Sequence, residues 1–143
     1  MIPHRYVETS ALLRVLLEGE APLRPALSGE GLVTSALTFV EAARALARAQ
    51  REGRLAAREA REAARQLAAF ERSCDIVAVD NEVLRRAREP FPVEPVRSLD
   101  AIHLASVRVL DDELGGLEVV SCDHRVRRNA EALGFRLVPA TLP

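Results

Sequence analysis

The chain has 143 residues, 48% of them hydrophobic and 3% aromatic, which predicts a single domain over residues 1–143 with an aliphatic core. Its 20 basic and 21 acidic residues give a formal net charge of −1, which excludes binding of nucleic acid by bulk charge and leaves only a local patch. All basic residues other than the histidines are arginines, so mechanisms that need a lysine amine are excluded.

Apolar periodicity predicts strands that alternate with helices along the chain. The strands are expected at residues 6–7, 32–33, 75–80, 117–120 and 136–138. The helices are expected at residues 10–17, from 38 to a break at Gly53, then 55–71, 81–88, 99–110 and 123–133. This alternation is typical of an α/β fold with helices on both faces of a mainly parallel sheet, here a three-layer α/β/α sandwich.

Local signals predict how some of these elements begin and end. Twelve of the 30 residues from 41 to 70 are alanine, the best helix former, and Gly53 divides this region into a helical hairpin. The segment DIVAVD, residues 75–80, is predicted to be a buried strand followed by Asp80 as the N-cap of the next helix. Ser98 is predicted to cap the helix that follows the proline-rich segment EPFPVEP.

Acidic residues occur where predicted strands end and helices begin. Glu8 follows the first strand and Asp123 follows the fourth, while Glu41 and Asp100 are expected in the first turns of their helices. Because ligands bind beyond the carboxyl ends of parallel strands, these four side chains are expected at one edge of the sheet. Carboxylates crowded together repel one another, and a divalent cation with oxygen ligands would neutralise them.

Each carboxylate also has a purely structural interpretation. Glu41 stands three residues after Thr38 and would complete a T-x-x-E capping box. Asp100 and Asp123, in first helical turns, are favoured by the helix dipole. Glu8 is harder to explain in this way, because the end of a buried strand is a poor place for an unpaired carboxylate. The hypothesis of a metal site therefore depends on the four residues together.

Four segments carry these acids: YVETSALLRVLL, LVTSALTFVEAARAL, VRSLDAIHLASV and VVSCDHRVRRNAEALGFRLV. In this order and at this spacing they resemble the PIN domain, and most closely the VapC-type toxins of bacterial toxin–antitoxin pairs. The resemblance covers nearly the whole chain. It departs from the family in one position, because the first acid is usually aspartate and here it is Glu8.

The resemblance implies a metal-dependent endoribonuclease that hydrolyses RNA phosphodiester bonds. Glu8, Asp100 and Asp123 would hold Mg²⁺ or Mn²⁺, and Glu41 would orient the attacking water or bind a second ion. It also implies a cognate antitoxin protein as partner, RNA as substrate, and a homodimer. Because Glu8 is longer than aspartate, the alternative is a PIN-like binding module with weak or no catalytic activity.

Side chains around the predicted site have open alternatives. Ser10 either caps a helix or hydrogen-bonds to an acidic neighbour. Leu12, Leu13 and Leu16 form either an antitoxin docking surface or a core face. Six arginines either hold RNA phosphates or simply face solvent: Arg14, Arg44, Arg97, Arg125, Arg127 and Arg128.

Other catalytic classes have no support in the sequence. There is no GxSxG elbow and no glycine-rich phosphate loop. His103, His124 and Cys122 match no standard zinc spacing, and His103 is expected to pack near Asp100. A phosphoacceptor receiver domain would need a lysine, which the chain lacks.

The chain is expected to be cytoplasmic, with no membrane partner. Cys74 and Cys122 lie far apart in the sequence and form no C-x-x-C pair, as expected for free thiols in a reducing compartment. The first twenty residues contain several charges and do not resemble a signal peptide. No uncharged apolar run approaches the roughly 18 residues needed to span a bilayer.

Overall fold

A parallel five-stranded sheet forms the centre of the computed structural model, which describes residues 3–142. The strand order is β3-β2-β1-β4-β5, and every neighbouring pair is parallel. The strands are β1 (Arg5–Val7), β2 (Leu32–Ser35), β3 (Asp75–Val77), β4 (Glu118–Val120) and β5 (Arg136–Val138).

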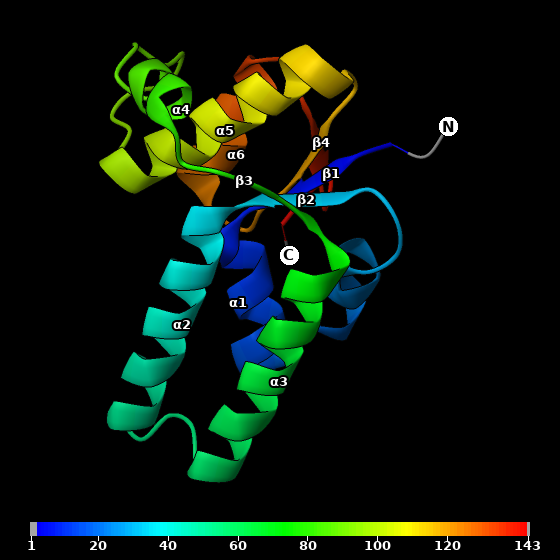
Figure 1. Ribbon diagram of the computed structural model, residues 1–143, viewed down its shortest axis with the longest axis vertical. Coiled ribbons are helices and arrows are strands. Elements are labelled where there is room, and N and C mark those ends of the chain that lie inside the picture. The colour runs from blue at the N-terminus through cyan, green and yellow to red at the C-terminus, as the bar shows by residue number, and fades with distance from the viewer. Residues whose placement is uncertain (1–2, 143) are drawn as a thin grey trace.

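Helices cover both faces of this sheet, so the predicted three-layer α/β/α sandwich is confirmed. They are α1 (Thr9–Glu18), α2 (Ala36–Arg51), α3 (Ala57–Ser73), α4 (Asn81–Arg86), α5 (Ser98–Leu114) and α6 (His124–Ala132), with a 3-10 helix η1 (Ala21–Leu27). In Figure 1, α1, α2 and α3 lie below the sheet and α4, α5 and α6 lie above it. Within residues 3–142, no helix is both long and apolar enough to cross a bilayer.

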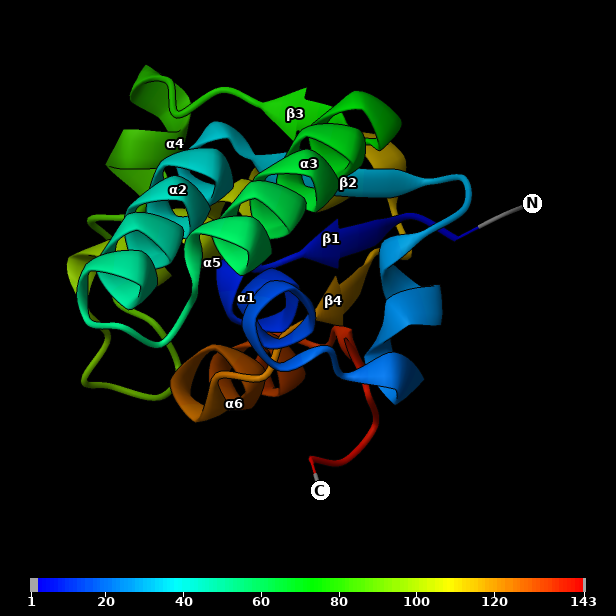
Figure 2. The same cartoon turned by 90° about the horizontal axis from the view of Figure 1, so that it is seen from below.

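The alternation of side chains along the strands divides the core between the two faces. Tyr6 pairs in register with Val33 and Val119, and these three buried side chains pack toward α5 and α6. Val7 and Val120, one position further along, pack on the opposite face against α1. Figure 2 shows α1, viewed nearly along its axis, near the middle of this second face and next to the α2–α3 hairpin.

The helical hairpin predicted from the alanine-rich region is confirmed. Helices α2 and α3 extend together away from the sheet (Figure 1) and pack around a small core of their own, which contains Leu46, Ala49 and Ala63. Gly53 lies in the connection with φ +77, a left-handed conformation that favours glycine.

Helix α2 begins two residues earlier than predicted. Its N-cap is Ser35, whose hydroxyl accepts a hydrogen bond from the backbone N–H of Leu37 (3.1 Å). Thr38 lies inside the helix, fully buried, and its hydroxyl accepts a hydrogen bond from Thr34 (2.8 Å). The T-x-x-E capping box is therefore wrong, and Glu41 lies in the second helical turn instead of the first.

Two other predictions, the burial of the strand at residues 75–80 and the cap at Ser98, are wrong. Residues 75–77 form an exposed edge strand, with Ile76 44% exposed, because β3 has only β2 as a neighbour in the sheet. Helix α5 starts at Ser98 with Arg97 as its N-cap residue, so Ser98 is not the cap. The cap predicted at Asp80 is confirmed, since its carboxylate accepts a hydrogen bond from the backbone N–H of Val83 (3.0 Å).

The proline-rich segment before α5 is anchored by a buried asparagine. The side chain of Asn129 in α6 donates to the carbonyl of Val93 and accepts from its N–H, both at 2.9 Å. The carboxylate of Glu94 accepts hydrogen bonds from the N–H groups of Phe91 (2.9 Å) and Val96 (3.0 Å). These bonds position the start of α5, and with it Asp100.

Candidate active site

Glu8 lies directly after β1 and is the N-cap of α1, with 5% of its surface exposed. Its Oε2 accepts a hydrogen bond from the backbone N–H of Ser10 (3.0 Å), and its Oε1 accepts from the hydroxyls of Ser10 and Ser121 (2.6 Å for Ser121). The positive end of the α1 dipole also favours a carboxylate here. Three donors and a helix N-terminus therefore compensate the charge at the end of this strand.

Ser10 joins α1 to the segment that follows β4. Besides donating to Glu8, its hydroxyl accepts a hydrogen bond from the backbone N–H of Cys122 (2.8 Å). Ser10 lies within α1, and Glu8 is the cap. Of the two alternatives for Ser10, the hydrogen bond to an acidic neighbour is confirmed and the helix cap is wrong.

Asp123 follows β4 and is the N-cap of α6. Its Oδ1 accepts hydrogen bonds from the backbone N–H groups of Arg125 (2.9 Å) and Val126 (3.1 Å). Its own N–H donates to the hydroxyl of Ser121 (3.1 Å), the same hydroxyl that donates to Glu8. Ser121 thus links the carboxylate of Glu8 to the backbone of Asp123. Asp123 precedes the first turn of α6, so its predicted place within that turn is wrong.

We expect Ser121→Ala to lower the free energy of unfolding by about 1–3 kcal/mol, because it leaves buried partners without a hydrogen bond. Ser121 is fully buried, and the carboxylate of Glu8 and the N–H of Asp123 both lose their contact with it. Urea unfolding measures the change. Ser28→Ala, at an exposed serine, is the matched control and is expected to change stability by less than about 0.5 kcal/mol. Equal stability of the two variants would contradict this role of Ser121.

Asp100 lies in the first turn of α5, half-buried, near the other two acids. Burial raises the pKa of its carboxyl, and the negative charges of Asp123 and Glu8 raise it further. Arg97 and His103 offset part of this effect. The negative charges of Glu8 and Asp123 therefore act on the carboxyl of Asp100.

The donor set fits a divalent cation in its chemistry. Carboxylate oxygens are the ligands that Mg²⁺ and Mn²⁺ prefer, and a cation would relieve the repulsion acting on Asp100. Within residues 3–142, no three Asp, Glu, His or Cys side chains are already arranged as a set that could hold an ion. Mg²⁺ often uses only one or two carboxylates and keeps several waters, so a complete protein cage is not required.

Glu41 is connected to this group through α1. Its Oε1 accepts a hydrogen bond from the hydroxyl of Thr9 (2.6 Å), the residue that follows Glu8, and lies 2.6 Å from Nε2 of His103. Burial would raise the pKa of Glu41, but the hydrogen bonds from His103 and Thr9 outweigh burial and hold it below its ordinary value. Glu41 is therefore ionised at neutral pH.

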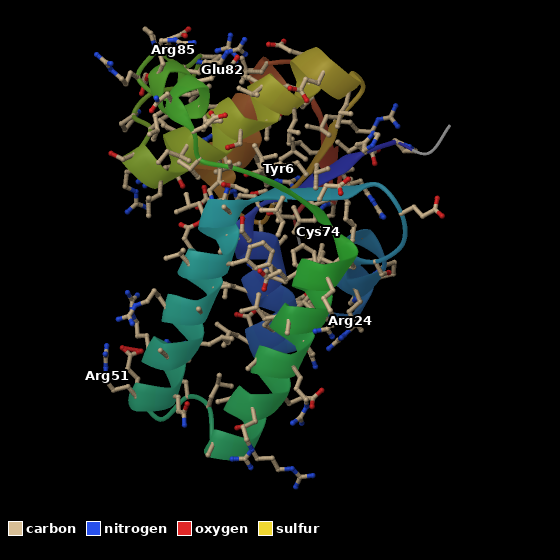
Figure 3. All side chains as sticks on the ribbon, in the orientation of Figure 1. Tyr6, Arg24, Arg51, Cys74, Glu82 and Arg85 are labelled. Carbon is tan, nitrogen blue, oxygen red and sulfur yellow. The ribbon has the colours of Figure 1, made fainter. Side chains whose placement is uncertain are left out.

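His103 is 1% exposed, and both of its ring nitrogens have hydrogen-bond partners. Its Nδ1 is 2.7 Å from the hydroxyl of Tyr6, and its Nε2 faces Glu41 and Thr9. Figure 3 shows Tyr6 in the interior of the molecule, between the sheet and α5, while Arg51 and Arg85 lie at the periphery. The sequence placed His103 near Asp100 but missed these contacts. The signal that could have found them is its position one turn after Asp100 on the same helix.

The structure decides between the alternatives for Arg127 and for the three leucines. Arg127 is buried and donates to backbone carbonyl groups, so it does not face RNA phosphates. Arg14 forms an ion pair with Glu18 (3.1 Å) at a partly exposed position. Leu12 is buried in the core, and Leu13 and Leu16 pack against core clusters as partly buried side chains. The core-face interpretation of these leucines is confirmed.

Comparison with known proteins yields matches in sequence and in structure. A family model described as "PIN domain" matches residues 5–132. Ribonuclease VapC35 of Mycobacterium tuberculosis is 34% identical over 145 residues, covering 93% of this chain and 94% of the relative. Ribonuclease VapC46 of the same species is 33% identical, covering 93% and 95%. A toxin–antitoxin complex from Klebsiella pneumoniae has the same fold, with a TM-score of 0.60 over 91% of this chain and 92% of that one at 16% identity.

Proposed function

Because the chain belongs to the PIN domain family, we propose that it is a metal-dependent endoribonuclease and the toxin of a toxin–antitoxin pair. Relatives named as VapC ribonucleases, similar over nearly their full length, support the ribonuclease activity. The observation that carries the proposal is that the pKa of Asp100, at the start of α5, is raised by burial and by the charges of Asp123 and Glu8, which follow β4 and β1.

In the proposed mechanism, Glu8, Asp100 and Asp123 hold Mg²⁺ or Mn²⁺, directly or through water. When bound, the ion would supply the polarisation of phosphoryl oxygens and the lowered pKa of water that phosphodiester hydrolysis needs. Glu41, kept ionised by its hydrogen bonds, orients the attacking water by accepting its proton in a hydrogen bond. Ser10 and Ser121 hold the carboxylate of Glu8 in place.

The alternative is a PIN-like module that binds partners without turnover. It is favoured by one observation, that three hydrogen bonds already engage the carboxylate of the unusual Glu8. Isothermal titration of the chain with Mg²⁺ and Mn²⁺ separates the two functions. Catalysis requires binding that is lost in Asp100→Asn, whereas absence of binding of either ion favours the module.

Co-expression tests the toxin function in cells. Expression of the chain alone is expected to arrest growth, and co-expression of the small open reading frame beside its gene is expected to restore it. Asp123→Asn is expected to abolish toxicity without unfolding the protein, because asparagine caps a helix as well as aspartate does.

The matched control for this experiment is Asp112→Asn. Asp112 is an exposed acid near the end of α5, paired with Arg86 (2.6 Å), and its variant is expected to stay toxic. Full toxicity of Asp123→Asn would exclude the proposed site, and harmless expression of the wild-type chain would exclude the toxin function.

We also propose that the chain is one cytoplasmic domain that forms a homodimer and is held inactive by a cognate antitoxin protein. The likeness to chains from toxin–antitoxin complexes supports the fold of such a toxin. Light scattering after size-exclusion chromatography, with and without the co-expressed partner, measures both assemblies.

A further inference from the structure

We propose that His103, oriented by Tyr6, is a positioning residue for Glu41 in the proposed RNA cleavage. The two residues and Glu41 form one hydrogen-bonded chain, called here the Tyr6–His103–Glu41 chain, that runs from the sheet core to the candidate site. This inference rests on the proposed function and adds residues that none of the four carboxylate roles includes.

The Tyr6–His103–Glu41 chain connects three different parts of the fold. Tyr6 lies in β1, His103 in α5 and Glu41 in α2, so the hydrogen bonds join helices on opposite faces of the sheet. Tyr6 and His103 are 0% and 1% exposed, whereas the side chain of Glu41 is 24% exposed. The buried end of the chain is therefore rigid, and the accessible end is a carboxylate.

The position of each proton follows from the donor and acceptor groups. A tyrosine hydroxyl has an ordinary pKa of about 10 and therefore carries its proton at neutral pH. That proton can be donated to Nδ1 of His103 at 2.7 Å. The proton of the neutral imidazole is then on Nε2, which donates to Oε1 of Glu41 at 2.6 Å.

Two donors on one carboxylate oxygen determine the orientation of Glu41. A glutamate side chain has three rotatable bonds, and fixing it in one conformation has an entropic cost. Thr9 and His103 both donate to Oε1, from α1 and from α5, so the carboxylate is held from two directions. The second oxygen stays available to a water or a substrate hydroxyl, as the proposed role of Glu41 requires.

Two substitutions of His103 separate positioning from packing. In His103→Gln, the amide nitrogen can replace Nε2 and still donate to Glu41. In His103→Asn, the shorter amide replaces Nδ1, faces Tyr6 and leaves Glu41 without this donor. Both variants place an amide in the same buried cavity, so a role in packing alone predicts similar losses of activity in the two.

RNA cleavage by the purified full chain with Mg²⁺ or Mn²⁺ is measured for both variants. We expect kcat to fall roughly 10- to 100-fold in His103→Asn and by no more than about threefold in His103→Gln, with KM for RNA little changed in either. Tyr6→Phe, which removes only the hydroxyl, is expected to give an intermediate loss. Val107→Ala, which truncates another buried side chain of α5 outside the chain of hydrogen bonds, is the control and is expected to keep full activity after folding is confirmed.

Spectra of the metal-free protein test the same inference without catalysis. Long-range ¹H–¹⁵N correlation is expected to show a proton on Nε2 of His103 and none on Nδ1, and a shifted Nδ1 resonance in Tyr6→Phe. The ¹³C resonance of the Glu41 carboxyl carbon is expected to move in His103→Asn and to stay near its wild-type position in His103→Gln.

The outcomes distinguish this inference from the proposed function. A proton on Nδ1, or equal losses in His103→Gln and His103→Asn, would overturn the positioning role even in an active enzyme. If the wild-type chain cleaves no RNA, the proposed function fails. If, in addition, the Glu41 carboxyl resonance does not move in His103→Asn, the positioning role fails as well.

Discussion

Asp100→Asn is expected to reduce RNA cleavage by about a hundredfold or more while making the metal-free protein more stable at neutral pH. The loss of activity follows from the loss of one of three carboxylates proposed to hold the metal ion. The gain in stability follows from electrostatics, because burial and the charges of Asp123 and Glu8 raise the pKa of Asp100 in the folded protein. Lower activity together with higher stability is the result expected of a site whose carboxylates repel one another when no cation is bound.

The sign of the stability change depends on pH. The folded protein binds the Asp100 proton more tightly than the unfolded chain does, so ionisation of Asp100 destabilises the fold as the pH rises through the raised pKa. Asparagine stays neutral and avoids this loss. Because Asp100 is only half-buried and partly screened, the gain is expected to be about 1 kcal/mol or less at pH 7, and to vanish below the ordinary pKa of an aspartate.

Thermal unfolding without metal at pH 7 and at pH 3, together with a cleavage assay and metal titration, measures these effects. Asp112→Asn, at an exposed acid of the same helix, is the control for loss of a negative charge. An Asp100→Asn protein that is less stable than wild type at neutral pH, or that still cleaves RNA at the wild-type rate, would contradict the placement of Asp100 in a crowded acidic site.

Arg127→Met is expected to lower the free energy of unfolding by about 2–4 kcal/mol. Arg127 is 6% exposed, and its guanidinium donates to the carbonyl groups of Ser121 (2.8 Å), Pro139 (2.7 Å) and Ala140 (3.1 Å). It therefore joins α6 to the end of β4 and to the segment after β5. Methionine fills a similar space but donates no hydrogen bond, so these carbonyl groups lose their partner.

Neighbouring positions provide the controls for Arg127. Arg128→Met removes an exposed arginine of the same helix and is expected to change stability by less than about 0.5 kcal/mol in urea unfolding. Arg127→Lys is expected to be nearly as unstable as Arg127→Met. A single ammonium group cannot reproduce the planar guanidinium, which donates both to the end of β4 and to the segment after β5. If Arg127→Met were as stable as Arg128→Met, the buried guanidinium would have no structural role.

The order of strands and helices could be predicted from the sequence because it depends on local patterns. Apolar periodicity, the alanine-rich region and Gly53 are properties of neighbouring residues, and they led to the five strands and the α2–α3 hairpin. Errors arose where two residues competed for one role. Ser35 and Thr38 can both cap a helix, and the structure uses Ser35 because Thr38 is buried against Thr34.

The candidate site was predicted only in part, because local patterns show where an acid lies along the chain but not which distant side chains it contacts. The positions of Glu8 and Asp123 directly after strands could be predicted, since strand ends are visible in the pattern of apolar residues. The partners of these acids could not. Ser121 is 113 residues from Glu8, and no local pattern indicates that its hydroxyl donates to that carboxylate.

By itself the sequence determined the alternation of strands and helices, the aliphatic core and the positions of the four acids along the chain, because these depend on residue type and short-range spacing. Only the tertiary structure decided which side chains meet. Strand order brings β1 next to both β2 and β4, and this places Tyr6, Glu41 and His103 within hydrogen-bonding distance across up to 97 residues. Such contacts depend on how layers pack across the sheet, a long-range property that local periodicity does not contain.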